Sequence, residues 1–487
     1  MKQVRFLMAV WASKLCAHAC RLTGSKGSSA PGVVARWIYP AILPELARRM
    51  DGKTVAVCGT NGKTTTNNLL AALLRAQGMR VICNEIGSNM IAGVITAYLE
   101  CCTRTGRVEA DIACLEVDEA FGVHVLPHIE PDIVIVTNLF RDQLDRYGEI
   151  DITRELLVRA LKKVPGAMLV LNGDDPLCAS LCRTPPRVRT FFGVSEEVPV
   201  PTGGESISDE SDAVQTEARE GRFCVFCHHE LQYRYYHYSQ LGDYFCEGCN
   251  FRRPTLDFAA REVRLDPHLA FSMNDLPVQT AYRGFYNVYN VLAALTVATL
   301  LEINLDDIDA VLASYAPQIG RMEEFVIDGM PAVLNLSKNP TGFNQTIAAM
   351  RADTRQKNVV VVVNDNDQDG TDISWIWDVD FEQMAEADAG FARFVASGIR
   401  AEDVALRMKY AEITPDTVLF EKDVRRVIEV LLRGEGEVTG KSGASRGEVL
   451  YVLVNYTPLF ETQRVLLDLQ AAGSAARADA TPRRRRA

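Results

Sequence analysis

The residues with the clearest chemistry form a glycine-bearing turn between two apolar segments. Residues 57–66 read Val-Cys-Gly-Thr-Asn-Gly-Lys-Thr-Thr-Thr, after an apolar run at 54–58 and before a helical pattern at 67–74. A strand, a turn and a helix in this order direct backbone N–H groups and a helix N-terminus toward an anion. The lysine of such a loop reaches nucleotide phosphates, and the next threonine suits Mg²⁺. We therefore predict a P-loop that binds ATP or GTP through Gly59, Thr60, Asn61, Gly62, Lys63, Thr64 and Thr65.

One departure leaves an alternative open for this turn. Valine stands at position 57, where the strict P-loop spacing has a glycine, so the loop would be a shorter variant. A simple glycine turn with a surface lysine would contain the same residues. That alternative, however, does not explain why a strand precedes the turn and a helix follows it.

Carboxylates follow a later apolar strand, in the segment Leu-Glu-Val-Asp-Glu at 115–119. Ligands of open parallel sheets bind at the carboxyl ends of the strands, so a carboxylate here is suited to hold Mg²⁺ together with Thr64. Glu116 is the first choice and Asp118 the second. The segment Thr-Asn-Leu-Phe-Arg-Asp-Gln-Leu-Asp at 137–145 also leaves a strand end, but alone it is equally typical of an acidic helix start.

Four cysteines have the spacing of a metal module. Two Cys-x-x-Cys pairs are separated by 18 residues, and each pair predicts a tight knuckle that presents two thiolates. Four thiolates fill a tetrahedral Zn²⁺ site completely, so the metal would be structural and not catalytic. The predicted zinc ligands are Cys224, Cys227, Cys246 and Cys249.

Composition narrows the class of protein. The 487 residues require several domains, and a net charge of −11 argues against a general nucleic-acid binder. The odd count of 13 cysteines indicates reduced thiols and a cytoplasmic protein. No segment has the roughly 18 apolar residues that span a bilayer. Val4, Leu7, Met8, Trp11 and Leu15 have helical spacing, and this helix either packs on the protein or touches the inner face of a membrane.

The alternation of strands and helices predicts an α/β fold with two separate series. A parallel-rich sheet covered on both faces is expected from the apolar runs at 54–58, 80–83, 111–117, 132–137 and 167–171. The second series has runs at 324–327, 332–336, 358–363, 391–396 and 449–454. We predict a helical segment at 1–50, a central domain at 51–317 with an acidic loop at 194–222 and the zinc ribbon at 223–253, a C-terminal α/β domain at 318–470, and a disordered basic tail at 471–487.

Aspartates gather in the segment 364–378, beside Trp375 and Trp377. One reading is a loop that caps a helix through Asp372 or Ser374. The other is that Asp372 orients a histidine of a partner protein, as the third member of a nucleophilic triad. No cysteine of this chain lies in a glycine-flanked strand-to-helix elbow, so if ammonia is a substrate, another protein must release it.

Several motifs together resemble the Mur ligase family. They are Gly-Thr-Asn-Gly-Lys-Thr-Thr at 59–65, the segment 137–145, Leu-Asn-Gly-Asp-Asp-Pro at 171–176, Asn287-x-x-Asn290 and Gly-Arg-Met-Glu at 320–323. The cysteine module and the segment 364–378 narrow the resemblance to the ligase-like subunits of lipid II isoglutaminyl synthases, from about residue 4 to 470. The resemblance implies a central P-loop domain and a Rossmann-like C-terminal domain.

This resemblance also implies roles for individual residues. Lys63 and Thr64 would contact phosphate and Mg²⁺, Glu116 would bind Mg²⁺, and Asn287 would contact the adenine side of ATP. Arg321 would reach a phosphate from the C-terminal domain. Asp372 would complete the catalytic Cys-His pair of a GatD-like glutaminase in a heterodimer.

The implied activity is ATP-dependent amidation of lipid II at the membrane surface. The D-glutamate α-carboxylate would become an acyl phosphate, and ammonia from the glutaminase would attack it to give D-isoglutamine. One alternative is a stand-alone Mur-type or folylpolyglutamate-type amino-acid ligase. Another is a nucleotide-switched protein whose zinc ribbon binds a partner, although the acidic net charge argues against nucleic acid.

Overall fold

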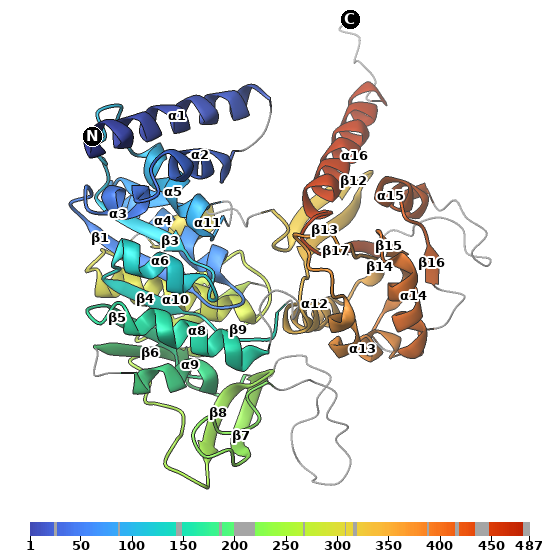
Figure 1. The fold of residues 1–487 in the computed structure, drawn as a ribbon. Coiled ribbons are helices and arrows are strands. Elements are labelled where there is room, and N and C mark those ends of the chain that lie inside the picture. Colours follow the sequence, from blue (N-terminus) through green and yellow to red (C-terminus); the bar gives the residue numbers. More distant parts are fainter. Residues whose placement is uncertain are drawn as a thin grey trace, which may run out of the picture. The chain divides into compact units, whose positions relative to one another are not determined.

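The chain folds into two compact units, which are drawn in Figure 1. The first contains the elements from α1 to α11, and the second those from β12 to α16. The structure, a computed structural model, describes residues 1–23, 27–85, 88–142, 149–184, 188–198, 220–265, 268–306, 308–314, 319–386, 389–413, 418–433 and 448–480. The predicted boundary at 317/318, most of the predicted acidic loop, and residues 143–145 of the segment 137–145 lie outside these ranges.

A nine-stranded sheet forms the centre of the first unit, in the order β11-β10-β9-β6-β5-β4-β1-β3-β2. Its strands are β1 (Lys53–Cys58), β2 (Val81–Cys83), β3 (Ile112–Glu116), β4 (Ile133–Val136), β5 (Met168–Asn172), β6 (Arg189–Val194), β9 (Phe258–Arg264), β10 (Leu269–Met273) and β11 (Leu276–Thr280). All neighbours from β2 to β9 are parallel, whereas β9, β10 and β11 pair antiparallel at one edge. The apolar runs predicted β1 to β5. The edge strands escaped prediction because polar residues such as Arg261 and Glu262 interrupt them.

Helices cover both faces of this sheet, as buried parallel strands require. One continuous core joins alternate strand residues such as Ala56, Cys58 and Leu115 to side chains of α1, α3, α5, α6 and α8. On the other side α4 and α10 pack together and contact the strands, and α11 contacts α4. The bounds of the helices are α1 (Lys2–Leu22), α2 (Ala30–Ile38), α3 (Ile42–Ala47), α4 (Lys63–Ala76), α5 (Ile91–Glu100), α6 (Gly122–Ile129), α8 (Ile150–Lys162), α9 (Pro176–Ser180), α10 (Tyr286–Leu300) and α11 (Ile308–Ser314).

The four cysteines lie on and beside a small hairpin that is inserted between β6 and β9. Its strands are β7 (Leu231–Tyr238) and β8 (Leu241–Cys246), paired antiparallel. A separate small core beneath the hairpin contains Tyr244 and Phe251 together with buried cysteines. This core also contains Ala179 of α9, so the hairpin packs on the first unit through a few apolar residues.

The second unit has a six-stranded sheet in the order β12-β13-β17-β14-β15-β16. The strands are β12 (Glu323–Ile327), β13 (Met330–Leu336), β14 (Gln356–Val362), β15 (Phe391–Ser397), β16 (Val418–Phe420) and β17 (Glu448–Val454). All pairs are parallel except β12–β13. The valine run of β14 divides between two cores, Val359 and Val361 on one face and Val360 and Val362 on the other, because successive strand side chains alternate.

Each face of the second sheet has its own helices. Helices α12 (Pro340–Ala352), α13 (Glu382–Ala385) and α14 (Ala401–Tyr410) and the short helix η2 (Ser374–Asp378) cover one face, and α15 (Val424–Arg433) and α16 (Leu459–Ala480) the other. Helix α16 continues ten residues past the predicted boundary at 470, because this stretch is rich in alanine, the best helix former. Among the described residues no helix is both long and apolar enough to cross a bilayer.

Candidate functional site

The predicted P-loop forms the turn between β1 and α4. Gly59 and Gly62 both have left-handed backbone angles, with φ of 122° and 81°. A Cβ on Gly62 would come within 1.9 Å of the Asn290 side-chain oxygen, and one on Gly59 within 2.3 Å of the Thr137 hydroxyl oxygen. Glycine is therefore required at both positions by conformation and by space. Lys63 begins α4, so the first-turn N–H groups of this helix face the end of the strand.

The loop that follows β4 holds this turn in place. Asn138 accepts a hydrogen bond from the Asn61 N–H at 2.8 Å through its side chain and one from the Thr60 N–H at 2.9 Å through its carbonyl. The Thr137 hydroxyl donates to the Asn61 carbonyl at 2.8 Å. The Thr60 hydroxyl accepts from the Phe140 N–H at 3.0 Å. The conformation of the P-loop is thus fixed by the first residues of the segment 137–145.

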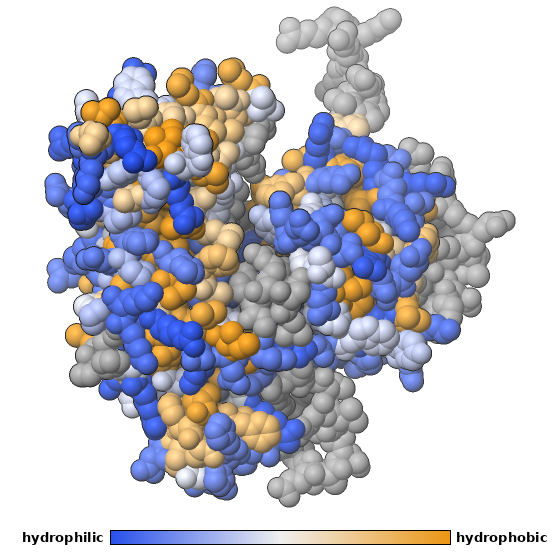
Figure 2. All heavy atoms as spheres, in the orientation of Figure 1, coloured by the Kyte–Doolittle hydropathy of each residue, from blue (hydrophilic) through white to orange (hydrophobic). Residues whose placement is uncertain are grey.

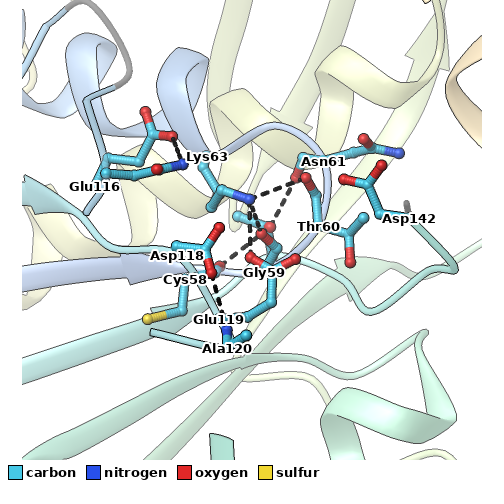
Figure 3. Close-up of polar contacts among 12 residues, drawn as sticks. Cys58, Gly59, Thr60, Asn61, Lys63, Glu116, Asp118, Glu119, Ala120 and Asp142 are labelled. Carbon is cyan, nitrogen blue, oxygen red and sulfur yellow. Dashed lines mark hydrogen bonds and ion pairs between the residues drawn. The ribbon is translucent and has the colours of Figure 1, made fainter. Parts of the chain in front are cut away.

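Lys63 is buried and is bound entirely within the site (Figure 3). Its ammonium group forms an ion pair with Glu119 at 2.9 Å and donates to the carbonyls of Gly59 and Thr60. Burial disfavours the charged form, but Glu119, Asp118 and Glu116 outweigh it and raise the pKa of Lys63. The lysine therefore stays charged, and Glu119 occupies one of the donor positions that a phosphate would use.

Glu116 lies at the end of β3, and only one of its two carboxylate oxygens accepts a hydrogen bond from a described residue. Its Oε1 accepts a hydrogen bond from Asn89 at 3.1 Å, while Asn84 binds its backbone on both sides at 2.8 Å. The other oxygen, Oε2, is buried without a hydrogen-bond partner among the described residues. An orphaned carboxylate oxygen fits a ligand of Mg²⁺. Asp118, the second choice, instead caps the start of the turn before α6 through the N–H groups of Ala120 and Phe121.

The remaining nucleotide candidates of the first unit lie on α10 and in the first turn of α4. Asn287 donates to the Arg283 carbonyl at 2.6 Å and accepts from Asn290 at 2.9 Å. The carbonyl of Asn290 in turn accepts from the Thr66 hydroxyl at 3.2 Å, which links α10 to α4. The pair Asn287 and Asn290 therefore borders the P-loop, and Thr64 and Thr65 lie beside it on α4.

The four cysteines meet at one point. Their sulfur atoms all lie within 4.8 Å of one another, with Cys224 3.6 Å from Cys249 and Cys227 3.3 Å from Cys246. A tetrahedral zinc ion with bonds of about 2.3 Å separates its sulfur ligands by roughly 3.8 Å, so the cluster fits a closed thiolate site. The backbone N–H of His229 lowers the pKa of Cys227 to about 6, which favours the thiolate form. His228 and His229 are not needed to complete the set.

The cysteine hairpin is connected to the nucleotide site through one buried glutamine. Gln240, in the turn between β7 and β8, donates to the Leu139 carbonyl at 2.6 Å. The N–H of Leu139 donates to the carboxylate of Asp175 at 2.8 Å, and burial raises the pKa of Asp175 to about 6. The peptide groups on both sides of Leu139 are thus held by two buried side chains, one residue before Phe140 contacts the P-loop.

A buried ion pair attaches the other end of the hairpin. Asp174, two residues after β5, pairs with Arg253 at 2.7 Å. It also accepts hydrogen bonds from the Tyr289 hydroxyl at 2.8 Å and from the Val194 N–H at 2.7 Å. Because Asp174 is completely buried, removing Arg253 would leave a charge without a counter-ion. The hairpin is therefore fixed to the sheet at two points.

The two candidates of the second unit lie far apart in its sequence. Arg321 is half-buried in the turn before β12, next to Met322, which has a positive φ of 53°. Asp372 is half-buried before η2, and its carboxylate accepts from the Ser374 N–H at 2.8 Å. This hydrogen bond lowers the pKa of Asp372, so the group is an anion near neutral pH. The Ser374 side chain also interacts with this carboxylate, so the capping role considered for Asp372 is present.

Two regions of the chain match family models, and the chain as a whole matches curated proteins. Residues 57–246 match the Mur ligase middle domain, and residues 336–459 match the MurT ligase C-terminal domain. The chain is 34% identical over 416 residues to the lipid II isoglutaminyl synthase (glutamine-hydrolyzing) subunit MurT of Staphylococcus aureus (strain COL), which covers 85% of this chain and 90% of that protein. The MurT subunit of Streptococcus pneumoniae (strain ATCC BAA-255 / R6) is 32% identical over 91% of this chain and 93% of its own length. The chain belongs to the MurT family.

Solved structures agree with this MurT assignment at the level of fold. A pseudomurein peptide ligase type C from Methanothermus fervidus superposes with a TM-score of 0.61 at 20% identity, over 86% of this chain and 79% of that one. MurF from Acinetobacter baumannii gives 0.61 at 16% identity, over 90% and 80%. The predicted Mur ligase-like α/β fold is confirmed.

Several residues of this site have no signal in the sequence that identifies their role. Glu119 belongs to the acidic segment 115–119, but its proximity to Lys63 depends on how the chain turns after β3. Gln240 belongs to no motif, because an isolated buried glutamine has no characteristic spacing. Asp175 belongs to the segment 171–176, but that motif does not show which group its carboxylate binds.

Replacing Gly62 by alanine should disable the P-loop, because the new Cβ would overlap Asn290 and the left-handed backbone would be strained. Gly78→Ala is the matched control, since Gly78 has a similar φ of 78° with open space around it. We expect a loss of about 1 kcal/mol for Gly78→Ala, and for Gly62→Ala a larger loss together with loss of ATP binding. Denaturant unfolding and binding of a fluorescent ATP analogue measure both. Equal behaviour of the two variants would contradict the steric argument.

Replacing Glu119 by glutamine should destabilise the nucleotide-free protein by about 3 kcal/mol, because a buried ammonium loses its counter-ion. The same change should enlarge the thermal stabilisation by ATP, since phosphate no longer competes with a carboxylate for Lys63. Differential scanning fluorimetry with and without ATP measures both effects. Glu109→Gln, at an exposed residue of the same unit, is the control. A smaller ATP shift in Glu119→Gln than in the control would show that the carboxylate assists binding.

Proposed function

We propose that this chain is the ATP-dependent ligase subunit of a glutamine amidotransferase that converts the D-glutamate of the lipid II stem peptide to D-isoglutamine. Membership of the MurT family is the observation that carries the proposal, since the matched MurT proteins are named as subunits of a glutamine-hydrolysing lipid II isoglutaminyl synthase. The buried Lys63 at a strand-to-helix turn supplies the physical basis for using ATP.

The proposed chemistry has two steps. An oxygen of the substrate α-carboxylate attacks the γ-phosphorus of ATP, the bond to the β,γ-bridging oxygen breaks, and ADP leaves. Ammonia then attacks the carbonyl carbon of the acyl phosphate, loses a proton, and inorganic phosphate leaves. In both steps most of the catalysis is positioning and stabilisation of charge.

Residues of the P-loop would hold the nucleotide during these steps. Lys63 would exchange Glu119 for the β- and γ-phosphates, and the N–H groups at the start of α4 would face the same oxygens. Thr64 and Glu116 would hold Mg²⁺, which neutralises phosphate charge when bound. Asn287 would contact the adenine side, and Arg321 would contribute a positive charge to the phosphates.

Ammonia would come from a glutaminase partner in a heterodimer. The support for this is the half-buried Asp372, whose carboxylate is kept anionic by its hydrogen bonds with Ser374. An aspartate of this kind suits the orienting position in a Cys-His-Asp arrangement whose other members lie on the partner. The alternative of a stand-alone amino-acid ligase predicts activity with free amino acids and without a second protein.

We further propose that the four-cysteine cluster binds zinc and that the zinc supports the nucleotide site. The support is the thiolate geometry and the hydrogen bond from Gln240 to Leu139. Two thiolate pairs joined by one ion fix the knuckles, and the hairpin then presents Gln240 at a constant position. The metal would be structural, because four protein ligands leave no position for substrate.

Asp372→Asn should separate the two half-reactions. Asparagine retains the cap to Ser374 but cannot stabilise an imidazolium, so glutamine-dependent amidation of lipid II should fall at least about tenfold while ammonium-dependent amidation is retained. Asp367→Asn, at an exposed aspartate of the same loop, is the control and should change neither rate. Lys63→Ala should abolish both. Mass spectrometry of the lipid II product measures these rates, and full glutamine-dependent activity of Lys63→Ala or Asp372→Asn would refute the assigned roles.

Gln240→Leu should weaken nucleotide binding without loss of zinc, because it leaves the buried Leu139 carbonyl without a donor. An unpaired buried carbonyl costs about 1–3 kcal/mol, and part of this should appear as a higher Kd for ATP. Gln232→Leu, on an exposed position of β7, is the matched control. Elemental analysis should give one zinc ion per chain for all three proteins. Chelation of that zinc should raise the Kd of the wild type and speed amide exchange at 59–61, and an unchanged Kd would show that the hairpin and the P-loop are independent.

A further inference from the structure

Helix α1 has apolar side chains on two opposite faces. Its inner face buries Phe6, Ala9 and Val10 in the core of the first unit. At about 100° per residue, a second set lies within an arc of roughly 60° on the opposite side. This outer set is Val4, Met8, Trp11, Leu15 and Leu22, with exposed fractions of 61%, 57%, 47%, 69% and 76%.

The apolar side chains of the outer face are not needed to pack the helix on the first unit. One apolar face already attaches α1 to α2 and α5, so the second face contributes nothing to the core. Neighbouring α2 adds Val33 and Trp37, which are 56% and 84% exposed. Figure 2 shows apolar residues gathered along the edge of the first unit where α1 lies. A contiguous exposed apolar surface marks a binding site for an apolar partner.

Positive charge accompanies this surface. Residues 1–44 contain six basic residues and no acidic one, although the whole chain has a net charge of −11. Five of them, Lys2, Arg5, Lys14, Arg21 and Arg36, lie in the part of this segment that the structure describes. The loop beside α1 adds Arg104 and Arg107, both exposed, and Arg104 lies over the Trp11 ring at 5.6 Å. Glu100 lies near Arg21 and Lys14, but the cations outnumber it. An apolar stripe with tryptophan, bordered by cations, is the pattern of helices that lie in the plane of an anionic bilayer surface.

We propose that the outer face of α1, together with Val33 and Trp37 of α2, binds the surface of an anionic lipid bilayer. The helix lies in the plane of the headgroups and inserts Met8, Trp11 and Leu15, while the basic residues contact lipid phosphates. The advantage of this contact rests on the proposed function, because the enzyme would then lie in the same bilayer as its lipid-linked acceptor. The contact itself requires neither ATP nor acceptor.

Co-sedimentation with vesicles tests the proposal on the full-length chain. Vesicles of equal parts phosphatidylcholine and phosphatidylglycerol should pellet the wild type, whereas vesicles of phosphatidylcholine alone should pellet much less. Trp11→Glu/Leu15→Glu should reduce the bound fraction about tenfold, because two inserted side chains become anionic. Leu406→Glu/Tyr410→Glu is the matched control, with the same spacing on exposed positions of α14. All three proteins should have similar thermal unfolding midpoints, since each substituted side chain is exposed and each variant loses only one surface ring contact, Trp11 with Arg104 or Tyr410 with Trp377.

Three outcomes would overturn the proposal. The first is that the wild type stays in solution with anionic vesicles. The second is that the Trp11→Glu/Leu15→Glu variant pellets as the wild type does. The third is that the wild type is a dimer by sedimentation velocity and this variant a monomer, in which case a second copy covers the face. Because ATP and lipid II are absent from the assay, failure of the amidation proposal would leave these results unaffected.

Discussion

A charged lysine buried between a strand and a helix is the constraint on which the first unit depends. Lys63 is only 6% exposed, and an ammonium group without partners would be very costly at that depth. Glu119 and two P-loop carbonyls supply the partners, and they require the end of β3 to lie beside the end of β1. The parallel pairing of β1 and β3 therefore brings Lys63 and Glu119 together, and this ion pair lets the lysine remain charged while it is buried.

The same requirement explains why the P-loop is held from several directions. Glycines let the turn come close to its neighbours. Atoms of Thr137, Asn138 and Asn290 occupy the space that a Cβ at Gly59 or Gly62 would need, and Asn138 also accepts a hydrogen bond from the turn. The loop after β4 that supplies two of these residues is itself bound by Asp175 and Gln240. A rigid turn presents its N–H groups without reorganisation when a phosphate arrives, and such preorganisation is where electrostatic catalysis gains most.

The sequence predicted the parts whose signal is local. The first five strands, the P-loop, helix α10 and the cysteine pairs all have a characteristic run or spacing within a few residues, and the structure contains each of them. The edge strands β9 to β11 lacked this signal because one face is polar. The partner of Lys63 was missed for another reason, since Glu116, Asp118 and Glu119 are equivalent by composition. Only the turn after β3 distinguishes them, giving one to Asn89, one to the start of α6 and one to Lys63.

The N-terminal helix α1 has one apolar face that packs on the protein and a second apolar face that is exposed. The spacing of Val4, Leu7, Met8, Trp11 and Leu15 predicted an apolar face, with packing and membrane contact as alternatives. In the structure Leu7 packs against the core together with Phe6 and Val10, whereas the other four predicted residues are exposed. An enzyme held at a bilayer meets a lipid-linked acceptor at a high effective concentration, as tethering does for any pair of partners. The two faces of α1 therefore serve separate purposes, one for the fold and one for the place where the proposed reaction occurs.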